Sequence, residues 1–196
     1  MVHSKVIVID CETTGLSPAQ GHRMVSFAAI TLPRPGAGSP SGLHLVFNPE
    51  RRCDPGAARV HGLSDAFLRH QPRFADHADS IRDFLAGAVL VAHNATFDAK
   101  FLDHELNLAG FPGSRFQYFC TMAEFRRRHP GHRYGLDAAA GLYGLDVTAR
   151  QQHHGAFVDA WIAGQLYCRL AWNAQPYPAP AVWPEFDNLR APEAEG

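Results

Sequence analysis

The chain has 196 residues and a formal net charge of −1, from 19 acidic and 18 basic side chains. This length suits one domain with a full core, and the charge excludes a protein that coats nucleic acid with a broadly basic surface. Its four cysteines are widely spaced with no CxxC pair, which predicts neither a zinc site nor a disulfide framework and favours the cytoplasm. No signal peptide and no contact with a membrane are expected, because no apolar run approaches a membrane span.

The first predicted element is a buried strand that ends in two acids. Residues 6–9 read Val-Ile-Val-Ile, and they are followed by Asp10, Cys11, Glu12 and the turn Thr13-Thr14-Gly15. Because side chains alternate along a strand, Asp10 and Glu12 point to the same face. Two carboxylates ~4 Å apart repel by roughly 4 kcal/mol at an effective dielectric of ~20. The pair indicates a bound cation or abnormal titration, unless the strand ends at Asp10 and both acids are solvated.

The remaining elements follow from apolar periodicity and turn signals. Apolar runs at 24–32 and 43–47 predict two further strands, so that residues 5–47 form an antiparallel meander. After a turn at 60–63, Ser64 is predicted to cap a short helix that reaches residue 70. Further along, the pattern predicts a helix at 74–85, a strand at 88–92, a helix at 95–108, a strand at 116–119, and helices at 121–128, 136–143 and 156–170. This order predicts an α/β fold, a mixed sheet with helices on both faces.

The predicted domain covers residues 1–171. From Trp172 onward, five prolines prevent a regular helix, so residues 172–196 are expected to form an extended tail. Such a tail is either a plain flexible segment or a docking segment for a polymerase or another protein.

Two more acids lie early in predicted helices. Asp98 lies one turn into the helix after the strand at 88–92, with Asn94 as the expected N-cap, and Asp159 lies in the first turn of the last helix. The helix dipole alone accounts for acids at these places. However, sites in α/β sheets form at the carboxyl ends of strands, where Asp98 is expected. His154 is predicted on the loop before the last helix, where it can fold back over the same site.

Other charged residues have simpler interpretations. Asp103 and Glu105 are predicted on the exposed side of their helix, and Asp137 is predicted to cap or pair locally at a helix start. The run Arg126–Arg128 is typical of a solvated helix face, although it can also contact phosphates.

Three motifs together resemble one family. They are Asp10–Gly15, His93–Asp98 and His154–Ala160. In order and spacing they are similar to the motifs of the DEDD-type, DnaQ-like 3′–5′ exonucleases, in the subgroup whose general base is His. The proofreading subunits of bacterial DNA polymerases form the most similar branch. The resemblance covers about residues 5–170. Cys11 departs from the Thr that the family commonly has there, and it is expected to point away from the metals.

The resemblance implies a ribonuclease H-like fold and two divalent cations, Mg²⁺ or Mn²⁺, which prefer hard oxygen ligands. Asp10 would bridge both cations, and Glu12 and Asp159 would complete the site of the first. Asp98 would hold the second. His154 would be the general base that takes a proton from the attacking water.

The resemblance also implies a pocket for a free 3′ end. Its substrate-binding residues would be Thr13, Thr14, Gly15, Leu16, His61, Asn94 and Phe97. The expected substrate is a single-stranded or frayed 3′ end of DNA, which is released as nucleoside monophosphates. Trimming of RNA ends is an alternative, because motifs do not show contacts to a 2′-hydroxyl. A non-catalytic polymerase-associated subunit is a second alternative, and the presence of all four acids and His154 argues against it.

Overall fold

The computed structural model describes residues 5–34, 36–152, 155–178 and 180. Its sheet has the strand order β3-β2-β1-β4-β5. The strands are β1 (Lys5–Thr13), β2 (Met24–Thr31), β3 (Ser41–Val46), β4 (Ala88–Ala92) and β5 (Gln117–Cys120). The first three pair antiparallel, whereas β4 and β5 run parallel to β1. The predicted meander and the α/β class are therefore confirmed.

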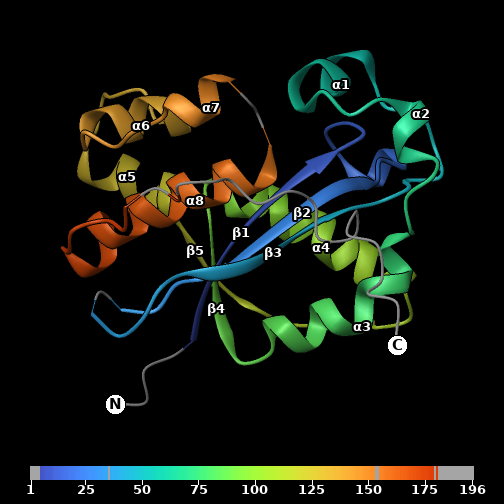
Figure 1. Cartoon of the computed structure of the whole chain (residues 1–196), viewed down its shortest axis with the longest axis horizontal. Coiled ribbons are helices and arrows are strands. Elements are labelled where there is room, and N and C mark those ends of the chain that lie inside the picture. Colours follow the sequence, from blue (N-terminus) through green and yellow to red (C-terminus); the bar gives the residue numbers. More distant parts are fainter. Residues whose placement is uncertain (1–4, 35, 153–154, 179, 181–196) are drawn as a thin grey trace, which may run out of the picture.

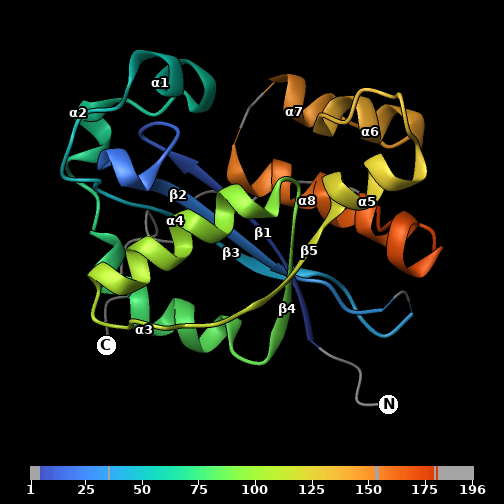
Figure 2. The same ribbon diagram turned by 180° about the vertical axis from the view of Figure 1, so that it is seen from behind.

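Helices cover both faces of this sheet. Figure 1 shows α8 over one face, and Figure 2 shows α3 and α4 over the other. The helices are α1 (Pro55–His61), α2 (Asp65–Leu68), α3 (Phe74–Leu85), α4 (Ala95–Leu108), α5 (Thr121–Arg128), α6 (Leu136–Leu142), α7 (Thr148–Gln152) and α8 (Ala156–Tyr167). A 3₁₀ turn spans Pro18–Gln20, and a π-helical turn at Cys168–Trp172 continues α8.

The apolar run in β1 is continuous because both of its faces are buried. Ile7 and Ile9 pack with α3 and α4 in one core, whereas Val6 and Val8 pack with α6 and α8 in the other. Asp10 and Glu12 continue the alternation that begins with Val6 and Val8. Their side chains are therefore directed to the face of the sheet that α8 covers.

The strand β1 runs through Asp10 and Glu12 to Thr13, because it pairs with β2 as far as Met24. The acids therefore lie within the strand, which excludes the alternative that the strand ends at Asp10 and confirms that the two side chains share a face. The helix α1 occupies part of the expected turn at 60–63; Pro55 at its first position suits a helix start. The five-residue α7 was not predicted either. The Ser64 cap is confirmed, because its Oγ accepts a hydrogen bond from the Phe67 N–H at 3.2 Å, although that helix ends at Leu68.

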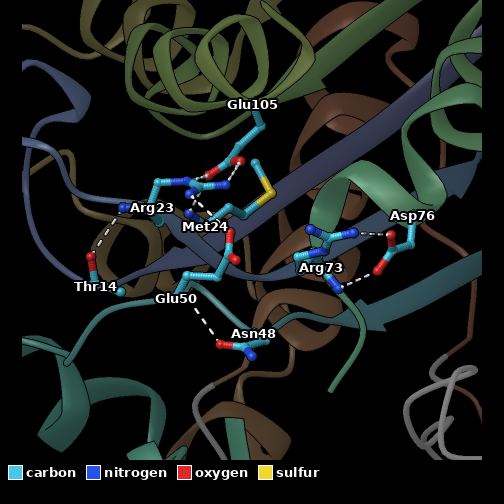
Figure 3. A network of polar contacts seen from close by, with 8 residues as sticks. All are labelled: Thr14, Arg23, Met24, Asn48, Glu50, Arg73, Asp76 and Glu105. Atoms are coloured by element: carbon cyan, nitrogen blue, oxygen red, sulfur yellow. Dashed lines mark hydrogen bonds and ion pairs between the residues drawn. The ribbon is translucent and has the colours of Figure 1, made fainter. Parts of the chain in front are cut away.

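The helix α4 is turned differently from the prediction. Glu105 was expected to be exposed but is 1% accessible, whereas Leu108, expected on the apolar side, is 59% accessible. The Glu105 carboxylate accepts hydrogen bonds from Arg23 Nε and Nη2, both at 2.8 Å, and from the Met24 N–H at 2.9 Å (Figure 3). These contacts compensate the burial of the charge and fix the rotation of α4 against β2.

The first described residues after position 171 contact the domain. Trp172 and Tyr177 pack against the second core, and the Tyr177 hydroxyl donates to the Pro33 carbonyl at 2.6 Å. Among the described helices, none combines the length and the apolar character needed to cross a membrane.

Candidate active site

Four carboxylates from three elements gather beside the outer half of β1. Asp10 and Glu12 come from β1, Asp98 from the first turn of α4, and Asp159 from the first turn of α8. Burial, followed by the negative charges of Asp98, Asp159 and Glu12, raises the pKa of Asp10 well above its ordinary value. The four predicted acids therefore lie close enough to repel one another.

Asp98 is positioned by an interruption in the sheet. The pairing of β4 with β1 ends at Val8, so the Cys11 N–H has no strand partner on that side. Asp98 Oδ1 accepts its hydrogen bond at 3.1 Å, while the Cys11 side chain packs in the first core. Burial of the Asp98 side chain raises its pKa to about 7. One oxygen of Asp98 thus satisfies the strand, and the carboxylate is held beside the other acids.

Arg150 is a site residue that the sequence reasoning missed. Its Nε donates to Asp159 Oδ1 at 2.7 Å, and its Nη1 donates to Asp137 Oδ2 at 2.6 Å. Burial and the nearby Asp159 raise the pKa of Glu12 to about 7, while Arg150 lowers it. A guanidinium thus already offsets part of the negative charge, at a position on the unpredicted helix α7.

The donor chemistry of the cluster fits Mg²⁺ or Mn²⁺. All four side chains offer hard carboxylate oxygens, and their mutual repulsion is relieved by a positive charge, as Arg150 already shows at Asp159. Within the described ranges, no three His, Cys, Asp or Glu side chains are arranged so that they would hold one ion as they stand.

A cavity of about 540 Å³ adjoins the acids. It is formed by the end of β1, the following turn, α1 and α4. Leu16 at its rim is 83% accessible, and the aromatic ring of Phe97 packs beside Phe101 at a centroid distance of 5.0 Å. Six of the predicted residues line it: Glu12, Thr13, Gly15, Leu16, His61 and Phe97. The cavity is mostly apolar apart from its acid edge, which suits the base and sugar of one nucleotide.

His61 lies at the end of α1 with a buried ring. Its Nδ1 accepts a hydrogen bond from the Leu63 N–H at 3.0 Å, and Nε2 has no hydrogen-bond partner among the described residues. Because Nδ1 accepts this hydrogen bond, the neutral ring carries its proton on Nε2. Burial lowers the pKa of His61, which favours this neutral form.

Two predicted residues do not line this cavity. Thr14 is buried behind it, where its hydroxyl accepts a hydrogen bond from the Arg23 N–H at 3.0 Å and contacts His22 Nδ1 at 3.1 Å. Asn94 is exposed and occupies the predicted N-cap position with a left-handed backbone, φ 78°, but its side chain makes no capping hydrogen bond. His154 lies outside the described residues.

The turn after β1 depends on His22, which the sequence reasoning did not select. A Cβ at Gly15 would collide with the His22 imidazole, so only glycine lets the turn approach that ring. His22 Nε2 also lies 3.5 Å from Asp54 Oδ2, and the Asp54 N–H donates to the Thr14 carbonyl at 2.8 Å. These contacts connect two walls of the cavity.

The raised pKa of Asp98 gives a testable pH dependence. Its carboxyl titrates near 3.9 in an unfolded chain and at about 7 in the fold, so the folded protein binds the extra proton between these values. Its contribution to stability is therefore present at low pH and is lost as the pH rises towards 7. We expect Asp98→Asn to remove this loss. The free energy of unfolding that is lost is at most ~1.4 kcal/mol per pH unit, which corresponds to roughly 3–5 °C in Tm.

The measurement is thermal unfolding in EDTA from pH 5 to 8. The Tm of wild type minus that of Asp98→Asn should decrease as the pH rises. A difference that stays constant or increases across this range would contradict the assignment of Asp98.

The chain is similar in sequence to a family of known proteins. A family model described as exonuclease matches residues 7–167. The chain is 38% identical over 173 residues to DNA polymerase III subunit epsilon of Rickettsia prowazekii (strain Madrid E), a match that covers 86% of this chain and 75% of that protein.

Solved structures share the fold at low sequence identity. Exonuclease I without ligand has a TM-score of 0.68 and 17% identity; the match covers 89% of this chain but only 43% of that protein. Exonuclease X in complex with 5′-overhanging duplex DNA has a TM-score of 0.63 and 23% identity, with coverage of 87% and 95%. These neighbours place the sheet in the ribonuclease H-like fold.

Proposed function

Because the chain belongs to the exonuclease family and is a 3′–5′ exonuclease, we propose that it uses two divalent cations to hydrolyse the last phosphodiester bond of a DNA strand. The observation that carries this proposal is the convergence of Asp10, Glu12, Asp98 and Asp159 beside an apolar cavity of one-nucleotide size. Carboxylates held together against their repulsion are the chemistry that a pair of divalent cations requires.

The chain's own residues hold and orient the reacting groups. The pKa of Asp10 responds to all three other acids, so Asp10 would contribute to the sites of both cations. Glu12 and Asp159 would hold the first cation with it, and Asp98 would hold the second. When bound, the cations supply Lewis-acid stabilisation of the attacking and leaving oxygens. His154, which precedes α8 in the sequence, takes the proton from the attacking water.

The cavity supports removal of single nucleotides from an end. Glu12 lies at its acid edge, so a nucleotide inside it places its phosphate at the carboxylates. Leu16 and Phe97 offer apolar contact to any base, which favours sequence-independent binding. A terminal nucleotide must leave its base stack to enter the cavity, so single-stranded and frayed ends are better substrates than paired ends. The products are nucleoside monophosphates.

A polymerase is the proposed protein partner, because the relative from Rickettsia prowazekii is named as a subunit of DNA polymerase III. The segment 172–196 is the proposed docking segment. Because Trp172 and Tyr177 pack on the domain, docking would use the part of the chain beyond them.

The test is cleavage of 5′-labelled single-stranded DNA and matched RNA with Mg²⁺, Mn²⁺ or EDTA. We expect shortening from the 3′ end that requires a divalent cation and is faster on DNA. Faster shortening of RNA would instead favour RNA trimming. If no cation supports shortening of either polymer, the proposed mechanism is wrong.

The neighbouring histidines provide a matched pair for the general base. We expect His154→Ala to reduce kcat by ~10²–10⁴-fold and His153→Ala to leave it nearly unchanged. Equal effects of the two substitutions on kcat would remove His154 from the mechanism.

A further inference from the structure

A second cavity, of about 580 Å³, also adjoins the acids. It is lined by residues 133–138, from the loop before α6 and the start of that helix, and by Arg150 of α7. Figures 1 and 2 both show α1 and the α6–α7 pair as separate groups of helices near the end of β1. The two cavities therefore reach the carboxylates from different elements: Glu12 lines the first, and Arg150, which contacts Asp159, lines the second.

Two contacts attach this second cavity to the active site. Arg150, on its wall, donates to Asp159 Oδ1 at 2.7 Å, so the wall reaches the acid cluster itself. The loop is fixed at a second point, where His93 Nε2 donates to the Tyr134 carbonyl at 2.9 Å. Since His93 directly follows β4, the loop that carries Tyr134 is tied to the same sheet edge as the acids.

The lining suits a nucleotide of a single strand. Tyr134 is 45% accessible, and the Arg126 guanidinium lies 4.5 Å from its ring centroid, which orients the ring. Arg133 is exposed beside Tyr134. The lining therefore contains two basic side chains, Arg133 and Arg150, and one acidic side chain, Asp137. An aromatic face with surrounding arginines is the chemistry that binds successive bases and phosphates of a single strand.

We propose that this cavity binds the nucleotide next to the terminal one, with its base stacked on Tyr134 and the strand's phosphates facing Arg133. The proposal rests on the proposed function, because it assumes that the terminal nucleotide occupies the cavity beside Leu16 and Phe97. The scissile phosphate then lies between the cavities, at the carboxylates. Stacking on Tyr134 makes a strand a better substrate than a single nucleotide ester.

The test compares two substrates in Tyr134→Ala. For oligo(dT) we expect KM to rise by roughly 5- to 150-fold, which corresponds to the ~1–3 kcal/mol of one stacked base. The p-nitrophenyl ester of thymidine 5′-monophosphate has no second nucleotide, so its hydrolysis should be unchanged. Tyr134→Phe keeps the ring and should behave as wild type, as should Arg115→Ala, which removes an exposed arginine near the start of β5.

If Tyr134→Ala impairs the cleavage of both substrates equally, or leaves the KM for oligo(dT) unchanged, this inference is overturned. The proposed nuclease function would still stand. If wild type cleaves neither substrate, the proposed function fails instead, and binding still tests the cavity. By fluorescence anisotropy of labelled oligo(dT) in EDTA, Tyr134→Ala should raise Kd by the same factor. Arg133→Ala should lower the slope of log Kd against log salt by about 0.7 for one lost phosphate contact. An unchanged Kd in Tyr134→Ala overturns the inference.

Discussion

Replacing Asp10 by Asn should reduce the rate of 3′-end hydrolysis by at least roughly 10³-fold. Asp10 is the acid whose pKa responds to all three other carboxylates, so it lies at the centre of the proposed cation site. A cation that stabilises the reacting oxygens contributes several kcal/mol, and each 1.36 kcal/mol is a factor of about ten in rate. The measurement is single-turnover cleavage of 5′-labelled single-stranded DNA in Mg²⁺.

The fold should survive this substitution. Asn has nearly the same shape, and it removes a charge that burial and three neighbouring acids oppose, so the Tm in EDTA should not fall. Asp103→Asn is the matched control, because Asp103 is an exposed acid on α4. Activity of Asp10→Asn within tenfold of wild type would contradict the proposed role. Equal losses in both variants would do the same.

Replacing Glu105 by Ala should destabilise the protein by ~3–5 kcal/mol. The change leaves the Arg23 guanidinium without its main partner at a position where its side chain is only 19% accessible, and it also removes the acceptor for the Met24 N–H. Breaking one member of a buried ion pair has a cost of this size. Thermal unfolding should show a Tm lower by roughly 6–20 °C, at ~2–4 °C per kcal/mol.

Glu124 provides the matched control on the surface. Its carboxylate also pairs with two arginines, Arg127 at 2.8 Å and Arg128 at 2.7 Å, but these side chains are 69% and 38% accessible. Glu124→Ala should therefore cost less than ~1 kcal/mol. If the two substitutions lower Tm equally, burial is not the reason that the Arg23–Glu105 contact stabilises the fold.

Glu105 also shows where reasoning from the sequence was incomplete. It lies seven residues after Asp98, two turns along the same stripe as Phe101 and Leu102. That spacing was a signal for burial, but a carboxylate in an apolar stripe becomes reasonable only when its partner is known. The partner, Arg23, is 82 residues away at the start of β2 (Figure 3).

The second cavity could not be predicted for a similar reason. Arg126 and Tyr134 lie on separate segments, and although the run Arg126–Arg128 could be considered for phosphate contact, nothing in the sequence pairs Arg126 with Tyr134. Arg150 belongs to a five-residue helix that is too short to give a periodic signal. Its role as the cation beside Asp159 follows from the packing of α7 near α8.

The sequence by itself determined the strands, the longer helices and the order of the acids. Local rules were sufficient there: strand alternation placed Asp10 and Glu12 on one face, and apolar periodicity located α3, α4 and α5. Only the tertiary structure decided which side chains complete the site and its supports. Arg150 beside Asp159, Asp98 on the Cys11 N–H and Glu105 on Arg23 are contacts between segments far apart in the chain or on different elements. Their partners are selected by the burial of charge, which local sequence does not reveal.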